Sequence, residues 1–150
     1  MQYQWKLPTW IYEHKDFILK NLLPIGMLSQ YQIYHDIGKP FCKTYDIDTH
    51  KYHFHNHANI SADTYSMVQD TNPIIEKLIR MDMDIHTIKA DDIEKFSLNK
   101  EAISLLITGL CEINANANMF GGIESTSFKI KFKQINNRGK RLIKTLKKGK

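Results

Sequence analysis

Apolar side chains that recur every three or four residues are the feature that most constrains the fold of this chain. The clearest case follows Asn72-Pro73, where Ile75, Leu78 and Ile79 fall on one side of a helix that turns about 100° per residue. Asparagine favours the cap position and proline the first turn, so this pair marks a helix start. With 150 residues, 42% of them hydrophobic, the chain is long enough to bury one core. We therefore predict a single, mostly α-helical domain.

This expected domain, residues 1–150, divides into a helical core at residues 1–122 and a basic segment at residues 123–150. Helices are indicated by apolar spacing, and a short hairpin by scattered β-formers around a polar run. The expected helices cover residues 9–22, 26–34, 58–68, 72–86 and 99–117, and the hairpin covers residues 41–55. Residues 87–96 favour a turn and a short helix. Gly109, inside the last helix, predicts a close contact with a neighbouring helix.

The C-terminal segment carries most of the positive charge. Residues 129–150 hold ten Lys or Arg and no Asp or Glu, in a chain whose formal net charge is +5. Apolar and basic residues alternate at 128–133, which predicts an amphipathic strand, and residues 140–147 predict a short basic helix after a turn. Such a block attracts the phosphates of nucleic acid or of a nucleotide, and it is equally compatible with a solvated end.

The chain lacks the sequence signals of a membrane or secreted protein. Its longest apolar runs fall short of the roughly 20 residues that a membrane span needs, and its first residues form no apolar signal-peptide core. The two cysteines, Cys42 and Cys111, lack metal-binding spacing and predict free thiols in a reducing compartment. We expect a cytoplasmic protein with no membrane partner.

The stretch from His35 to Pro40 is the strongest chemical signal. His35 and Asp36 offer an imidazole nitrogen and a carboxylate oxygen to one point, as a divalent transition metal requires. Gly38 and Pro40 are expected to end the preceding helix, glycine by taking a left-handed closing conformation. Lys39 lies in that turn, where its ammonium could reach a bound phosphate.

A second pair of candidate residues lies near the end of the helix that starts at Asn72. On its helical wheel, Asp82 and His86 share the apolar face and Asp84 faces solvent. A buried carboxylate must be paired, protonated or bound to a metal, because leaving it bare costs several kcal/mol. Asp82 and His86 could therefore share a metal or a phosphate. The alternative is a buried Asp-His hydrogen bond without metal.

Taken together, these stretches resemble the HD superfamily of metal-dependent phosphohydrolases. The residues that carry the resemblance are His35-Asp36-Ile37-Gly38-Lys39-Pro40, the expected hairpin, His53-Phe54-His55-Asn56-His57-Ala58 and Ser61. The chain is most similar to the HD domain that accompanies CCA-adding and poly(A)-polymerase-type nucleotidyltransferases. The clear match covers residues 35–61, and looser similarity extends from residue 14 to residue 118. The resemblance implies an HD-type helical bundle.

The resemblance also implies a set of site residues. It assigns metal binding to His35 and Asp36, to the upstream His14, and to either Asp82 or Asn114. Asn114 stands where the family commonly has its final aspartate, and a neutral amide binds metal more weakly. His14, on the apolar side of its expected helix, also fits a core histidine bonded to a carbonyl. Lys39, His57 and His86 are expected to neutralise charge on the phosphoryl oxygens or to protonate the leaving group. His53 and His55 are interpreted as surface or substrate-proximal.

The function that follows is that of a metal-dependent phosphohydrolase acting on a nucleotide or a phosphate-bearing nucleic-acid end. One or two divalent ions, drawn from Mn, Co, Ni, Fe, Mg and Zn, would activate water for attack on phosphorus. One alternative is a nucleotide- or nucleic-acid-binding module, in which the histidine site is degenerate and the basic segment binds the phosphates. Another is a structural or regulatory partner of a second enzyme. The small size is compatible with a homo-oligomer.

Overall fold

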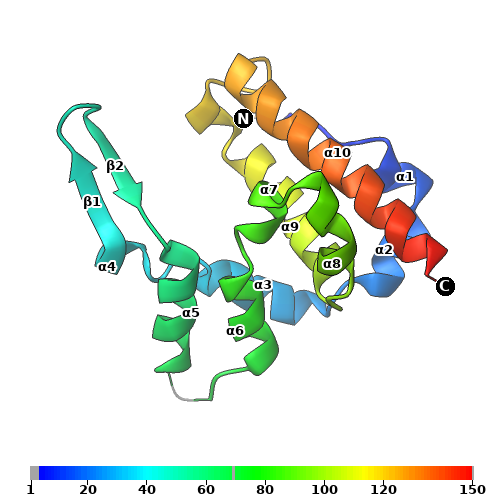
Figure 1. Cartoon of the computed structure of the whole chain (residues 1–150), viewed down its shortest axis with the longest axis horizontal. Coiled ribbons are helices and arrows are strands. Elements are labelled where there is room, and N and C mark those ends of the chain that lie inside the picture. The colour runs from blue at the N-terminus through cyan, green and yellow to red at the C-terminus, as the bar shows by residue number, and fades with distance from the viewer. Residues whose placement is uncertain (1–3, 69, 150) are drawn as a thin grey trace. The chain divides into compact units, whose positions relative to one another are not determined.

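The computed structural model describes residues 4–68 and 70–149 and confirms a mostly helical fold with a short antiparallel hairpin (Figure 1). The described residues belong to two compact units. The middle unit is Pro24–Met83, and the terminal unit is the chain up to Leu23 together with the chain from Asp84 onward. Among the described helices, none combines the length and the apolar character needed to cross a membrane.

Three helices build the core of the middle unit. They are α3 (Ile25–Tyr34), α5 (His57–Ser66) and α6 (Pro73–Arg80). α6 packs against both of the other two helices. The predicted cap is confirmed, because Oδ1 of Asn72 accepts the N–H groups of Ile74 and Ile75. Ile75, Leu78 and Ile79 are buried, so the apolar spacing identified the correct face of α6.

A short helix and the hairpin connect α3 to α5. α4 (Lys39–Cys42) leads into β1 (Lys43–Asp46), which pairs antiparallel with β2 (Lys51–Phe54). Lys43 lies opposite Phe54 and Asp46 lies opposite Lys51, as predicted for a hairpin within residues 41–55. Pro40 lies in the first turn of α4, where proline is well tolerated. α3, the helix that Pro40 was expected to end, ends earlier, at Tyr34. The hairpin returns the chain to α4, and α5 begins beside it.

The terminal unit combines the two ends of the chain. Its elements are α1 (Trp10–Glu13), α2 (Lys15–Asn21), α7 (Asp84–Thr87), the 3₁₀ helix η1 (Ala90–Asp92), α8 (Ile93–Ser97), α9 (Ala102–Ala115), the 3₁₀ helix η2 (Ala117–Phe120) and α10 (Thr126–Lys148). α10 packs against α8 and α9. The close contact predicted at Gly109 is confirmed, because a Cβ there would lie 2.8 Å from Cγ2 of Ile85.

Within the basic segment, Thr126–Lys148 form one 23-residue helix, α10. The predictions of a strand at 128–133 and of a turn before residue 140 are therefore wrong. Alternation over six residues suggested a period of two, but the buried positions in the whole segment have a helical period. They are Phe128, Ile135, Gly139, Leu142 and Ile143. Ser125 caps the helix by accepting the N–H of Phe128. Gly139 lies inside α10, and only glycine fits there without a shift, because a Cβ would lie 2.5 Å from the Trp10 ring.

Two predicted helices are interrupted. The helix expected at 9–22 breaks at His14, whose φ of −123° and ψ of 25° leave the helical region. The helix expected at 72–86 ends at Arg80, and α7 begins only at Asp84. The prediction that Asp82 and His86 share one face of one helix is therefore wrong. Asp82 is nevertheless buried, whereas Asp84, expected in solvent, is half-buried, and this burial raises the pKa of its carboxyl group.

Candidate metal centre

Gly38 and Ser61 bring the turn between α3 and α4 close to α5. The N–H of Gly38 donates to Oγ of the buried Ser61 over 2.8 Å. A Cβ on residue 38 would lie only 2.4 Å from the main-chain nitrogen of Ser61. Gly38 has a φ of −81°, so the predicted left-handed conformation is wrong and the close approach is what requires glycine. This contact fixes α5, which begins at His57, against the turn that carries the His35-Asp36 pair.

Two histidines of the middle unit are each anchored through Nδ1 to a main-chain carbonyl three residues earlier. Nδ1 of His35 lies 2.7 Å from the carbonyl oxygen of Gln32, and Nδ1 of His57 lies 3.1 Å from that of Phe54. Because a carbonyl oxygen only accepts, each Nδ1 carries the hydrogen. Nε2 is then the atom that each ring offers to the site. Metal-binding histidines commonly have their other ring nitrogen held in this way.

The carboxylate of Asp36 is flanked by these two Nε2 atoms. Oδ2 of Asp36 lies 3.4 Å from Nε2 of His35, and Oδ1 lies 3.7 Å from Nε2 of His57. Both separations are longer than a normal N–H···O hydrogen bond. Oδ1 is buried without a hydrogen-bond partner among the described residues. A buried oxygen in that condition costs about 1–3 kcal/mol, so it favours a cation or a proton donor at this position.

Lys39 neutralises the other oxygen of the same carboxylate. Its Nζ lies 2.6 Å from Oδ2 of Asp36 and 5.7 Å from the centre of the Phe54 ring. The side chain is more than a third exposed and can move. A divalent ion bound to Oδ2 would have to displace this ammonium, which would then be available to an anion bound beside the ion.

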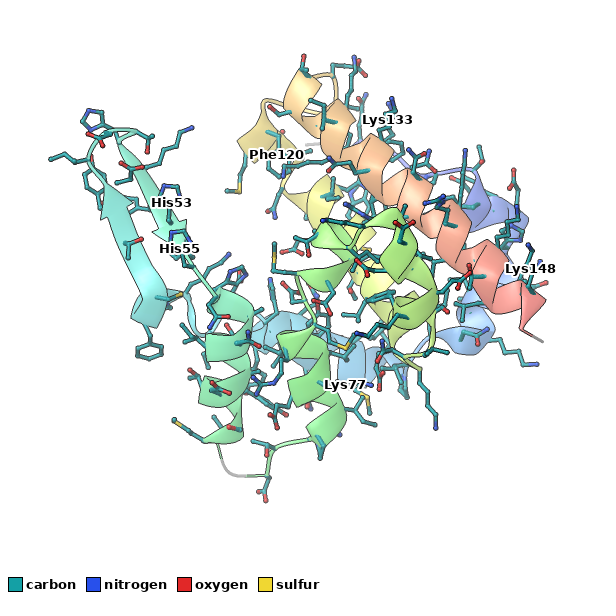
Figure 2. The ribbon with its side chains drawn as sticks, in the orientation of Figure 1. His53, His55, Lys77, Phe120, Lys133 and Lys148 are labelled. Carbon is teal, nitrogen blue, oxygen red and sulfur yellow. The ribbon has the colours of Figure 1, made fainter. Side chains whose placement is uncertain are left out.

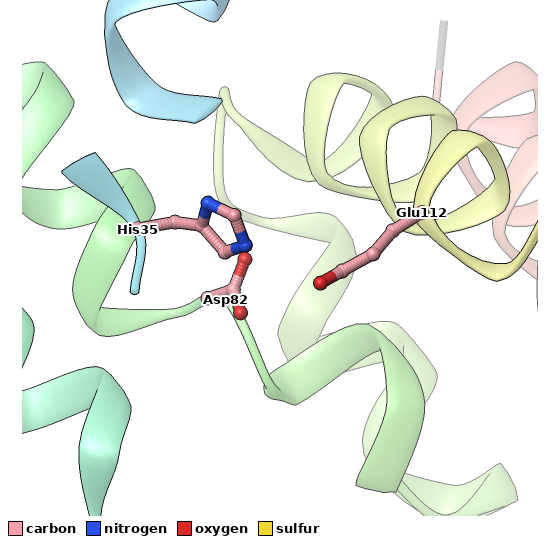
Figure 3. Close-up of side chains that lie close together, drawn as sticks. All are labelled: His35, Asp82 and Glu112. Carbon is pink, nitrogen blue, oxygen red and sulfur yellow. The ribbon is translucent and has the colours of Figure 1, made fainter. Parts of the chain in front are cut away.

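Asp82 approaches the same histidine from the turn after α6. Its Oδ1 accepts the hydroxyl hydrogen of Tyr31, and both residues are buried. A carboxylate oxygen of Asp82 and a ring nitrogen of His35 lie within 4.8 Å of each other (Figure 3). Glu112, also labelled in Figure 3, belongs to the terminal unit. Within the middle unit, the structure thus places His35 and His57 beside Asp36, and it places Asp82 beside His35.

Three other predicted site residues lie in the terminal unit, where each has a partner. Nδ1 of the half-buried His14 lies 3.3 Å from Nζ of Lys147. Nε2 of His86 lies 3.6 Å from a carboxylate oxygen of Glu112, and the histidine ring packs against Gly109. This pairing gives His86 a carboxylate partner other than Asp82.

The side chain of Asn114 joins α9 to the N-terminal segment. Its Oδ1 accepts the N–H of Lys6 over 2.7 Å, and its Nδ2 donates to the carbonyl oxygens of Lys6 and Leu110 over 3.1 and 3.0 Å. Asn114 is 6% exposed. The amide therefore satisfies main-chain groups that would otherwise be buried without partners.

Sequence reasoning missed the groups that orient these side chains. Tyr31, which bonds Asp82, precedes His35 by four residues and therefore lies on the same side of α3. Gln32 and Phe54 contribute only their main-chain carbonyl groups. Every residue has such a group, so the sequence does not reveal this role. The only available signal was the separation of three residues, which allows a histidine to reach back to a carbonyl at a helix or strand end.

Comparison of the chain with protein-family models, with curated proteins and with solved structures finds no match.

Proposed function

We propose that this chain is a metal-dependent phosphohydrolase of the HD type, acting on a nucleotide or on a phosphate-bearing nucleic-acid end. The observation that carries the proposal is the arrangement around Asp36. Two histidines anchored through Nδ1 present their Nε2 atoms to its carboxylate, and one oxygen of that carboxylate is buried without a hydrogen-bond partner among the described residues.

The residues present fit a divalent transition metal. His35 would be the central ligand, because its ring lies near the carboxylate of Asp36 and near that of Asp82, either of which could complete the site. His57 lies beside the second oxygen of Asp36. Neutral imidazole and carboxylate are the donors that such ions prefer. When bound, a divalent ion supplies Lewis acidity toward a phosphoryl oxygen and lowers the pKa of water.

Two residues suit the remaining needs of phosphate hydrolysis. Lys39 carries an ammonium on a partly exposed side chain beside Asp36, and we assign it to neutralising charge on the phosphoryl oxygens. His57 is held through Nδ1, so its Nε2 can accept or donate a proton near the Asp36 carboxylate. We assign it to proton transfer to the leaving group.

The proposal is tested by a turnover screen. Purified protein is incubated with nucleoside mono-, di- and triphosphates and with 5′- and 3′-phosphorylated oligonucleotides, in the presence of Mn²⁺, Co²⁺, Ni²⁺ or Mg²⁺. We expect phosphate release with at least one ion and none in EDTA. His57→Gln should lower kcat at least about tenfold, as loss of an acid or base does. His50→Gln, a matched change at an exposed histidine in the hairpin turn, should leave kcat unchanged. Metal-independent turnover, or equal loss in the two variants, would contradict the proposal.

A further inference from the structure

The exposed side of α10 carries a straight row of lysines. At about 100° per residue, Lys129, Lys133, Lys140, Lys144 and Lys147 fall within an arc of about 60°. At about 1.5 Å per residue, the row is about 27 Å long. We call these five residues the lysine row. Figure 2 labels Lys133 and Lys148 on this helix.

The charge of this row is only partly compensated. Lys129 lies 2.8 Å from the carboxylate of the exposed Glu124, which compensates its charge. Nζ of Lys147 lies 3.3 Å from Nδ1 of His14, a group that carries no negative charge. Lys133, Lys140 and Lys144 are exposed and have no hydrogen-bond or ion-pair partner among the described residues. α10 itself contains no Asp or Glu. Such a linear array attracts a linear polyanion.

A pocket adjoins the lysine row on the same helix. It has a volume of about 560 Å³, within the range of small-molecule sites. One wall is polar and comes from α10, with Gln134, Asn137, Arg138 and Arg141. The other wall is formed by residues 87–90 and by the buried Ile93. Nε of Arg138 donates to the carbonyl oxygen of Ile88 over 3.1 Å, which holds the guanidinium in place between the walls.

The chemistry of this pocket suits an unpaired nucleobase. Guanidinium planes stack on bases, and amide side chains such as Gln134 and Asn137 hydrogen-bond to base edges. Asp91 and Glu94, with Arg141, line an adjoining hollow. These two carboxylates would repel phosphate on that side, so the phosphates of a strand must follow the lysine row.

An anionic membrane is a poorer partner for this surface. A helix that binds a bilayer inserts an apolar face beside its basic one. The apolar face of α10 is already buried in the protein, since Phe128, Ile135, Leu142 and Ile143 are each at most 1% exposed. The surface therefore offers charge without an apolar face to insert.

We propose that α10 binds single-stranded nucleic acid, with the phosphates on the lysine row and a base in the adjoining pocket. Single-strand binding commonly combines a basic track with sites that receive individual bases. This inference rests on the terminal unit alone and does not depend on the metal centre.

Fluorescence anisotropy with a labelled 20-nucleotide RNA of mixed sequence, in EDTA and over a series of salt concentrations, tests the proposal. The variant Lys133→Gln/Lys140→Gln/Lys144→Gln removes three charges from the row. The matched control Lys20→Gln/Lys95→Gln/Lys100→Gln removes three exposed charges elsewhere in the terminal unit. Circular dichroism checks that both are folded. We expect the row variant to lose affinity at least about tenfold and its salt slope to fall by about 2, since each phosphate contact contributes about 0.7.

A third variant measures the contribution of the pocket to binding separately from that of the lysine row. Gln134→Ala/Asn137→Ala removes neutral groups, so it should weaken binding while the salt slope stays unchanged. A single strand should bind more tightly than a duplex of the same length. Equal losses in the row variant and its control, equal affinity for strand and duplex, or tighter binding to phosphatidylserine vesicles than to RNA would overturn the proposal.

Discussion

Nε2 of His57 lies 3.7 Å from Oδ1 of Asp36, an oxygen that is buried and has no hydrogen-bond partner among the described residues. Nδ1 of this histidine is held by the carbonyl oxygen of Phe54, so the ring cannot rotate to offer Nδ1 without losing that bond. The two groups thus face each other at ion-pair distance without a hydrogen bond. This relationship is the main structural support for a cation at the site.

Lys39→Met should separate metal binding from catalysis. The ammonium of Lys39 lies 2.6 Å from Oδ2 of Asp36 and competes with a divalent ion for that oxygen. We expect the variant to bind Mn²⁺ more tightly in calorimetric titration and to turn over substrate more slowly. Lys51→Met, on the exposed hairpin, is the matched control and should change neither quantity. Weaker Mn²⁺ binding by Lys39→Met would rule out the competition.

Gly38→Ala should strongly destabilise the protein. The added Cβ would lie 2.4 Å from the main-chain nitrogen of Ser61 and 2.7 Å from the carbonyl carbon of Ile60, and neither backbone atom can move freely. We expect a loss of about 3 kcal/mol or more in the free energy of unfolding, at the upper end of overpacking effects. Urea denaturation measures the change.

Gly26→Ala provides the opposite control for that experiment. Gly26 lies in α3, and a Cβ there would meet nothing within 4 Å. Alanine favours the helix over glycine by about 0.5–1 kcal/mol, so this variant should be more stable than the wild type. A similar loss of stability in both variants would show that the contact with Ser61 is not the cause.

Asn114→Asp should destabilise the terminal unit. The carboxylate would lose both donated hydrogen bonds and would face the carbonyl oxygens of Lys6 and Leu110. Leaving these groups unpaired costs about 1–3 kcal/mol each, so we expect a clear fall in Tm. Asn118→Asp, at an exposed position, should change Tm little. A metal-ligand role for residue 114 would instead appear as tighter Mn²⁺ binding by Asn114→Asp.

Asp84→Asn should stabilise the protein at neutral pH. Burial raises the pKa of the Asp84 carboxyl group in the folded state above its ordinary value of 3.8, so ionisation costs the folded state more than the unfolded state. The wild type therefore loses stability as the pH rises from 3.8 through the higher folded pKa, and the variant does not. Tm measured from pH 3 to pH 8 should diverge across that interval. Parallel curves for the two proteins would contradict this account.

Helical periodicity was predictive where one face of a helix is buried over several turns. Ile75, Leu78 and Ile79 of α6 were identified in this way, as was the cap at Asn72. The same principle failed over the short run at 128–133, where Phe128 and Phe132 are also four residues apart and stack in α10. A six-residue window does not distinguish a period of two from one of 3.6 when basic residues fill the gaps.

The sequence pattern did not predict where helices are interrupted or which distant residues contact each other. No glycine or proline marks the breaks at His14 and after Arg80. The burial of Asp82 was predicted correctly, but it results from the turn after α6 and the hydroxyl group of Tyr31. The contact between Gly38 and Ser61, which positions His57, joins residues far apart in the chain. No local propensity specifies such a contact.

Direct measurement of metal binding tests the central claim most sharply. Metal-free protein is titrated with Mn²⁺, Co²⁺, Ni²⁺, Zn²⁺, Fe²⁺ and Mg²⁺ by calorimetry, beside Asp36→Asn and the exposed control Asp16→Asn. We predict at least one ion bound per chain by the wild type and by the control, and at least about tenfold weaker binding, or about 1.4 kcal/mol, by Asp36→Asn. Failure of the wild type to bind any of these ions, or equal binding by Asp36→Asn, would contradict the account.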